Sequence, residues 1–392
     1  MRTRWIWMAL CALPLAAEPE GPVIREGKYW VQTVEGTAPA APGGRLKVNS
    51  VGAIVVRGDA GPSLRYSAKK RVRTDSLEEA KRLLGRAQVR VSRQGYGAVI
   101  DVGGPVCGRC DFSADLQIQV PRTTQETVLA THGGTLEVYD IEGRVNAETA
   151  GGSIQMDRIG KAVLAGTAGG AITLGAIGGA VRCETAGGSI KVGSAGGDTV
   201  LTTNGGGIEV GQVEGTLRVE SAGGSIRAGR VTGNVVAETA GGSIHLSKIG
   251  GRVNADTAGG SITVESASGG VNAENADGGI KLLDVAGALR AATASGNIWA
   301  QLEGQPILDS VLETSMGDIV VLIPRQLRLT IRAHVDVATS LARIQCEFAD
   351  VNIRLVDQGP GPRSLVAEGA INGGGPLLRI HNTSGTIQIK RK

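Results

Sequence analysis

The amino-acid sequence predicts an all-β fold, a single-chain parallel β-solenoid of 18-residue coils with two short strands per coil and one short helix near the N-terminal side. Three observations predict it: an 18-residue repeat, 61 glycines in 392 residues, and an aromatic content of only 3%. The glycine count is about twice the average usage. Few aromatic residues exclude a core built on Phe, Tyr and Trp, and 41% hydrophobic residues exclude a disordered glycine-rich tail.

Residues 1–17 have the features of a secretory signal peptide. Arg2 and Arg4 form a basic start, the segment from Trp5 to Leu15 is apolar, and the small residue Ala17 suits cleavage. The apolar segment is shorter than a transmembrane helix, and no later segment reaches the roughly 18 consecutive apolar residues of a span. We therefore expect an exported protein with no transmembrane segment in the mature chain, located in the periplasm, on the cell surface or outside the cell.

Residues 18–130 form the expected N-terminal β-rich capping region, in which strand patterns occur without the 18-residue interval. A helix is predicted near residues 76–85. Ser76 and Glu79 have the spacing of a capping box, in which Ser76 caps the helix start and Glu79 reaches back to it. Gly85 suits the C-terminal stop. The helix has one apolar stripe, formed by Leu77, Ala80, Leu83 and Leu84.

Of the five cysteines, only Cys107 and Cys110 are close in sequence. In an oxidising compartment the pair is interpreted as a local disulfide. A thioredoxin-type site would need a βαβ context, and a zinc site would need two further ligands that no second Cys or His motif supplies. Cys183 occupies a small inward position of the repeat and is interpreted as structural. The sequence predicts neither a metal nor a cofactor.

The regular 18-residue repeat occupies residues 131–300. A buried aliphatic residue, preceded in most repeats by a glycine pair, recurs at Leu136, Ile154, Ile172, Ile190, Ile208, Ile226, Ile244, Ile262, Ile280 and Ile298. A second strand pattern alternates apolar and polar residues, as in Val253–Thr257. The glycine pairs mark tight corners, where we expect them to supply positive φ. No single repeat can bury its own apolar face, so the repeats must stack.

Two known 18-residue coil types do not fit this repeat. A left-handed hexapeptide helix would need aliphatic residues six and twelve positions after Ile154, where Gly160 and Gly166 stand. The calcium-binding β-roll would need an aspartate in place of Met156. We expect right-handed coiling, because crossovers between parallel strands prefer that hand.

Alternation assigns the faces of each second strand. In Val253–Thr257 the first, third and fifth residues should point inward, and Asn254 and Asp256 outward. The inward threonines are expected to hydrogen-bond along the stack, and they include Thr185, Thr203, Thr239 and Thr257. On the other strand, Trp299 ends a mixed outward column. Packing under the C-terminal cap is preferred for it over a role as an exposed contact residue.

Residues 301–392 are expected to form an irregular continuation of the solenoid and a C-terminal cap. The turn-and-strand pattern Met316–Ile319 is displaced, so that Ile319 follows Ile298 by 21 residues instead of 18. The chain then ends with Asn372–Pro376 and Ser384–Ile389, which combine turn residues with a last strand pattern.

Several stretches resemble the bacterial "putative adhesin" family of β-strand-repeat domains. They are Asp115–Arg122 ahead of the repeats, the Gly-x-Ile-x-Val strand pattern, and the ending with Asn372–Pro376 and Gly385–Ile387. The resemblance covers most of the mature chain, although Ala-Gly-Gly stands where many members have Asn-Gly. It implies export, a β-solenoid and surface adhesion, and it brings no catalytic residues.

An outward acidic column is the candidate binding stripe, formed by Glu220, Glu238, Asp256 and Glu274 in consecutive coils about 4.8 Å apart. It suits a cationic surface or loosely held divalent ions. The alternative is repeat duplication, with the repulsion screened by solvent and by Arg218 and Arg290. The net charge of +4, or 39 − 37 = +2 without the two arginines of residues 1–17, is too small to imply nucleic acid or an anionic membrane as partner.

These features favour a non-enzymatic, adhesin-like binding or scaffold module whose ligand is a surface or envelope protein or glycan. A periplasmic envelope-associated scaffold or sensing partner is the alternative. A polysaccharide-processing enzyme would need an irregular carboxylate cluster or a metal in a groove. The histidines are scattered along the sequence and are interpreted as ordinary surface or turn residues: His132, His245, His334 and His381.

Overall fold

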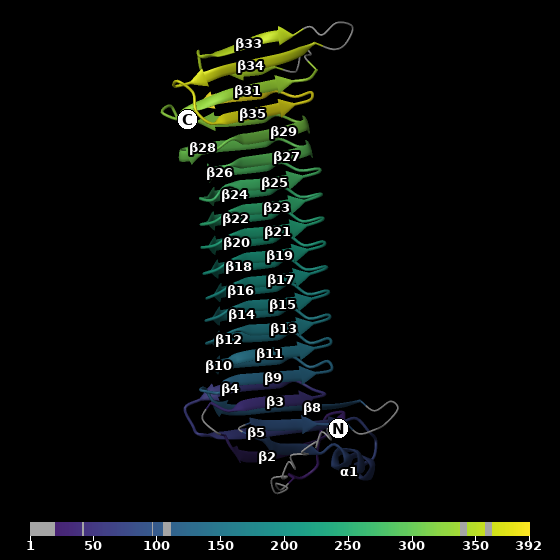
Figure 1. The fold of residues 1–392 in the computed structure, drawn as a ribbon. Helices are drawn as coiled ribbons and strands as arrows, with labels where there is room; N and C mark the ends of the chain where they lie inside the picture. The colour runs from purple at the N-terminus through teal and green to yellow at the C-terminus, as the bar shows by residue number, and fades with distance from the viewer. Residues whose placement is uncertain (1–19, 41–42, 96, 105–110, 338–342, 357–362) are drawn as a thin grey trace, which may run out of the picture. The chain divides into compact units, whose positions relative to one another are not determined.

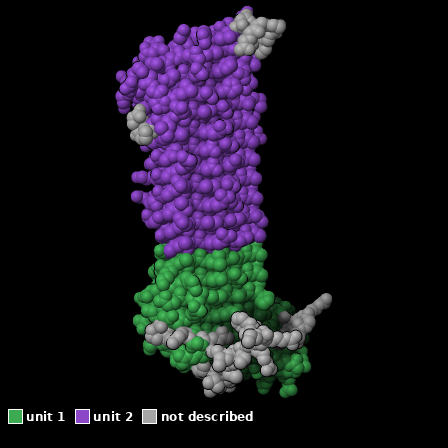
Figure 2. All heavy atoms as spheres, in the orientation of Figure 1, with its two compact units in different colours: residues 1–178 green, residues 179–392 purple. Residues whose placement is uncertain are grey.

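The computed structural model describes residues 20–40, 43–95, 97–104, 111–337, 343–356 and 363–392. The chain divides into two compact units, residues 1–178 and 179–392, which Figure 2 shows in green and purple. Within each unit, short strands alternate along the chain between two sheets, and most strands pair in parallel with the equivalent strand of the next coil (Figure 1). The predicted all-β parallel β-solenoid is confirmed, with one helix among the described residues.

Two of the sequence predictions concern parts of the chain outside the described residues. They are the signal peptide of residues 1–17 and the disulfide between Cys107 and Cys110. Among the described residues, no helix combines the length and the apolar character needed to cross a membrane. The described cysteines, Cys183 and Cys346, are both free. Burial raises the pKa of the Cys183 thiol to about 12, which keeps it protonated and unreactive and agrees with a structural role.

Unit 1 combines an antiparallel entry with the first coils. One sheet has the order β1 (Ile24–Glu26), β2 (Tyr29–Pro39), β5 (Ser63–Val72), β8 (Phe112–Pro121), β4 (Ile54–Asp59), β10 (Leu136–Ile141), β12 (Ile154–Ile159) and β14 (Ile172–Ile177). The other has the order β6 (Val89–Gln94), β7 (Gly97–Val102), β3 (Arg45–Ser50), β9 (Glu126–Thr131), β11 (Arg144–Thr149) and β13 (Val163–Thr167). Thus β3 and β4 already form a coil, and before β9 the chain makes an excursion that adds β5, β7 and β8 on the other side of that coil.

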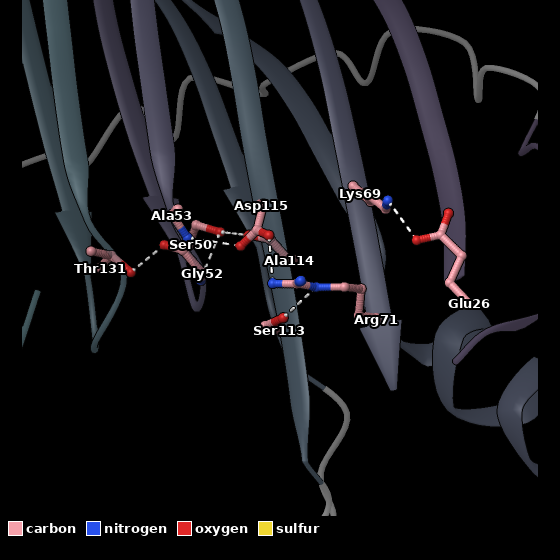
Figure 3. A network of polar contacts seen from close by, with 10 residues as sticks. All are labelled: Glu26, Ser50, Gly52, Ala53, Lys69, Arg71, Ser113, Ala114, Asp115 and Thr131. Atoms are coloured by element: carbon pink, nitrogen blue, oxygen red, sulfur yellow. Dashed lines mark hydrogen bonds and ion pairs between the residues drawn. The ribbon is translucent and has the colours of Figure 1, made fainter. Parts of the chain in front are cut away.

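A polar network joins the first coils of unit 1 to this excursion (Figure 3). The Asp115 carboxylate accepts a hydrogen bond from the Ala53 amide at 3.1 Å and pairs with Arg71 at 2.7 Å. Thr131 donates to the Gly52 carbonyl at 2.7 Å, so the turn after β3 is bonded on both sides. The network satisfies backbone groups where antiparallel strands meet parallel ones.

The predicted helix is α1 (Leu77–Arg86), which continues through Gly85 and ends one residue later than expected. Ser76 caps it by accepting from the Glu79 amide at 3.4 Å. The Glu79 carboxylate accepts from the Thr74 hydroxyl at 2.8 Å, in place of the return contact to Ser76 that a capping box would have. Ala80, Leu83 and Leu84 pack against Val72, whereas Leu77 is exposed, contrary to its predicted place in the stripe.

Unit 2 continues the coils and ends with strands out of sequence order. One sheet runs β16 (Ile190–Ala195), β18 (Ile208–Val213), β20 (Ile226–Val231), β22 (Ile244–Ile249), β24 (Ile262–Ala267), β26 (Ile280–Gly287), β28 (Ile298–Ile307), β30 (Ile319–Ile323), β36 (Ile387–Arg391) and β32 (Ile344–Cys346). The other runs β15 (Val181–Thr185), β17 (Thr199–Thr203), β19 (Leu217–Ser221), β21 (Val235–Thr239), β23 (Val253–Thr257), β25 (Val271–Asn275), β27 (Leu289–Ser295), β29 (Ser310–Met316), β35 (Leu377–Asn382), β31 (Leu329–Val335), β34 (Ser364–Ile371) and β33 (Val351–Val356).

Each coil interior is filled by small and aliphatic residues in the predicted columns. Val253, Ala255 and Thr257 are buried, and the pairing of Ala237 with Ala255 continues the small column. The threonines bond along the stack, as expected, but to backbone. Thr257 donates to the carbonyl of Gly242, fifteen residues earlier, at 2.8 Å, and accepts from an amide three residues later. These hydroxyls therefore satisfy corner groups that no strand ladder reaches.

The glycine pairs do form the corners, but most of them lack the expected positive φ, which Gly270 of the pair Gly269–Gly270 does have, at 93°. Neither Gly241 nor Gly242 has φ in the left-handed region. A Cβ on Gly242 would lie 2.2 Å from the Gly224 carbonyl oxygen of the preceding coil, whereas a Cβ on Gly241 would have no atom closer than 3.6 Å. The second glycine of the pair is required because successive backbones approach closely there, which leaves no room for a side chain.

Candidate functional site

The structure brings the four residues of the acidic column together on β19, β21, β23 and β25 of unit 2. Parallel pairing places Glu220 beside Glu238, Glu238 beside Asp256, and Asp256 beside Glu274. Buried residues flank each of them on its own strand, because inward and outward positions alternate. The carboxylates therefore line one face of the sheet at strand spacing, about 4.8 Å from one to the next.

Arginines balance part of this column. Arg218 contacts Glu220, and its Nη2 lies 3.5 Å from Glu238 Oε1. Arg290 Nε lies 3.5 Å from Glu274 Oε1. These are the two arginines of the screening alternative: Arg218 is shared by Glu220 and Glu238 at the start of the column, and Arg290 contacts Glu274 at its end. Asp256 has no ion pair with any residue that the structure describes.

The column continues past Glu274 through residues that are far apart in sequence. Glu274 lies beside Ala292 of β27, and Ala292 beside Glu313 of β29. Because β35 inserts between β29 and β31, His381 comes next, and His334 of β31 lies beside it. The negative column thus ends in a histidine pair.

A hollow of about 520 Å³ opens along this continuation in unit 2. Ala292 stands between two carboxylate positions, so the surface is recessed there, and Ala258, Ala276 and Ala294 add little bulk at the neighbouring corner. The charged or titratable lining residues are Asp256, Glu274, Glu313 and His381, and the lining contains no Lys or Arg. Glu313, like Asp256, forms no ion pair within the described ranges. The hollow is therefore a locally negative site.

At the end of the column, His334, Asp336 and His381 form a compact cluster. His381 Nε2 lies 2.9 Å from Asp336 Oδ1, and His334 Nε2 lies 3.7 Å from the same oxygen. The ring centroids are 5.8 Å apart, with the rings tilted by 58°. The Nε2 atom of His334 is buried and has no hydrogen-bond partner among the described residues. This is a set of N and O donors facing one point.

The sequence analysis missed the second half of this site. The histidines are scattered along the sequence, but the structure makes His334 and His381 neighbours in the sheet. Glu313 was detectable, because the displaced repeat moves Ala292 forward by 21 residues to position 313. Trp299, for which packing under the cap was preferred, is 39% exposed and lies beside Lys281 on the other sheet.

No protein-family model and no curated protein matches the chain. Solved structures with some similarity include a "putative adhesin" from Bacteroides fragilis, with 15% identity, a TM-score of 0.32, and coverage of 68% of this chain and 95% of that one. A "putative cell adhesion protein" from Clostridium sporogenes has 10% identity and a TM-score of 0.19, with coverage of 92% and 100%. A "putative lipid binding protein" from Parabacteroides distasonis has 10% identity and a TM-score of 0.23, with coverage of 91% and 97%. The first two names agree with the family that the sequence resembles, and at these TM-scores the likeness carries no functional inference.

Proposed function

We propose that this protein is an exported, non-enzymatic, adhesin-like binding module whose hollow on unit 2 holds cationic groups of a surface or envelope protein or glycan. One observation carries the proposal. Asp256, Glu274 and Glu313 line a recess whose lining contains no lysine or arginine, and of the three only Glu274 contacts an arginine among the described residues, Arg290 at 3.5 Å. A recess lined by one sign of charge attracts the opposite sign.

The regular pairing of the coils keeps the carboxylates of this recess in fixed positions. Each strand of the column is bonded to a neighbour on both sides, so the carboxylates are carried by a stiff sheet rather than by a loop. Little conformational entropy is then lost when a ligand binds. Because the carboxylates are partly exposed to solvent, the attraction should weaken with salt.

The proposal predicts that a short lysine peptide binds to the hollow and that removing its charge abolishes this binding. In the triple variant Asp256→Asn, Glu274→Gln and Glu313→Gln, loss of three exposed charge contacts of about 0.5–1 kcal/mol each should weaken hexalysine binding roughly 10- to 100-fold. Fluorescence anisotropy with labelled hexalysine at low and high salt measures the change.

Glu184→Gln with Glu220→Gln and Glu238→Gln is the matched control. It removes the same number of charges from the same outward column, in strands that do not line the hollow. The control should bind within about twofold of the unmodified protein. If the triple variant is more stable and binds hexalysine as before, the column is only a product of repeat duplication and the proposal is wrong.

A further inference from the structure

The histidine–aspartate cluster at the end of the column has the composition and the spacing of a metal site. His334 and Asp336 are two residues apart and point to the same side of the chain, and His381 comes from the adjacent strand β35. One donor atom from each of the three lies within 4.8 Å of the other two. No other group of three such side chains in the described ranges meets this spacing.

The donor distances fit a single ion of the transition series. A tetrahedral ion bound at 2.0–2.1 Å separates its ligand atoms by about 3.3 Å. The two distances to Asp336 Oδ1, 2.9 Å from His381 Nε2 and 3.7 Å from His334 Nε2, lie on either side of that value. Small side-chain rotations would therefore place all three atoms on one ion.

A second observation supports a ligand at this point. The buried Nε2 of His334 has no hydrogen-bond partner among the described residues, and its 3.7 Å separation from Asp336 is too long for a hydrogen bond. A buried polar atom without a partner costs about 1–3 kcal/mol. A metal ion at this position would accept the Nε2 lone pair and remove that cost.

We propose that His334, Asp336 and His381 bind one divalent transition-metal ion, of which zinc is the reference case. Two imidazoles and one carboxylate are borderline ligands that favour such ions over calcium or magnesium, which prefer oxygen ligands alone. With three protein ligands the ion keeps an open position. His381 also lines the hollow, so a bound ion would lie at the edge of that recess.

The bound ion would join two strands that are distant in sequence. Asp336 donates its amide to the Asn382 carbonyl at 3.0 Å, so the end of β31 is already bonded to the end of β35. Coordination by residues of both segments would fix the cap of unit 2 more firmly. This site is independent of the proposed function, because zinc binding is measured directly and needs no hexalysine.

The test is a titration of the untagged, metal-free full chain with zinc, followed by calorimetry, and with cobalt, followed by visible absorption. The background carries Cys107→Ser and Cys110→Ser, so that this cysteine pair does not bind the metals. We expect one equivalent of zinc and cobalt bands typical of a site with nitrogen and oxygen ligands. Zinc should also raise the melting temperature.

His381→Ala and Asp336→Asn should weaken zinc binding roughly tenfold or more and remove the rise in melting temperature. The matched control is His245→Ala. His245 is 42% exposed and contacts one carboxylate, Glu265 Oε1, at 3.1 Å, but has no third ligand group within the described ranges. Asp336→Asn retains the shape of the side chain, so loss of binding with an unchanged circular dichroism spectrum would not reflect misfolding. Absence of one-to-one binding, or equal binding by His381→Ala and His245→Ala, would overturn the proposal.

Discussion

Gly242 shows why the repeat is so strict at single positions. Its backbone lies against the carbonyl of Gly224, 2.2 Å from where a Cβ would stand, and the same close approach recurs at Gly260 with 2.0 Å. A Cβ on the first glycine of these two pairs, Gly241 or Gly259, would have only ordinary van der Waals contacts, with no atom closer than 3.6 Å. The coil spacing thus requires glycine at the second position and leaves the first position free for other residues, such as Asp277 and Met316 in later coils.

Gly242→Ala and Gly241→Ala form a matched pair for this interpretation. Gly242→Ala should lower the free energy of unfolding by about 1–3 kcal/mol or more, because the methyl group forces two backbones apart. Gly241→Ala should leave the free energy of unfolding unchanged or raise it by up to about 1 kcal/mol, since alanine reduces the entropy of the unfolded chain. Urea unfolding followed by circular dichroism measures both. Equal effects at the two positions would contradict the steric explanation.

At this scale the sequence predicted side-chain direction well and its causes less well. Alternation placed Ala255 inside and Asp256 outside, because a strand permits only two faces. The sequence analysis attributed the glycine at position 242 to a positive φ. The true cause is a close contact between the backbones of two coils, and neither segment shows such a contact by its own sequence. The histidine pair was not predicted for the same reason: His334 and His381 are 47 residues apart and become neighbours only because β31 pairs with β35.

The coil is the element that repeats in unit 2, and each of its two strands is bonded to an equivalent strand 18 residues away. Ile226 lies beside Ile244, and Ala237 beside Ala255. Nearest-neighbour contacts of this kind make a coil an interchangeable part. Its boundaries were predictable because the buried aliphatic residue and the glycine pair repeat without insertion.

Deletion of one whole coil of 18 residues should therefore leave a folded protein, whereas deletion of 17 residues should not. Deletion of residues 237–254 joins Val236 to Ala255 and keeps the inward and outward positions. Deletion of 237–253 joins Val236 to Asn254 and turns Asn254 and Asp256 inward, where an unpaired charge is costly. The melting temperature of the first variant should stay within a few degrees of the unmodified protein, and that of the second should fall clearly. Similar melting of both variants would show that the coils tolerate a change of register.

At the end of unit 2, the sequence predicted the next strand but not the order of the strands that follow it. The displaced pattern Met316–Ile319 indicated a further strand, and β30 confirms it. The order β29, β35, β31, β34, β33 was not predictable, because the repeat has decayed and strand order is set by which edges remain open. Half of the candidate site depends on that order.

The whole molecule has a small net charge of +4, yet its charge is unevenly placed. The hollow gathers Asp256, Glu274 and Glu313 without a lysine or arginine in its lining. The small net charge gave no reason to expect nucleic acid as a partner, and it gave no indication of this local negative site. Composition and repeat together were enough to predict the architecture. Prediction of the hollow would also have required the register in which the strands from β23 to β31 pair.

Export to the surface is the prediction that concerns the chain as a whole. If residues 1–17 direct export and the protein is an adhesin, an antibody against the folded protein should label intact cells that produce it. Flow cytometry measures the labelling, and an antibody against a known periplasmic protein controls for leakage. Labelling only after the outer membrane is opened would contradict surface exposure and favour the periplasmic scaffold.

The interleaved end of unit 2 also has a consequence for the order in which the protein matures. β35 lies between β29 and β31, and β36 lies between β30 and β32, so strands that come late in the sequence occupy interior places in both sheets. Each coil before them can form by adding to a neighbour that is already in place. β31 and β32 cannot join the stack in this way, because β35 and β36 lie between them and the coils before. The end of unit 2 therefore cannot form strand by strand in sequence order.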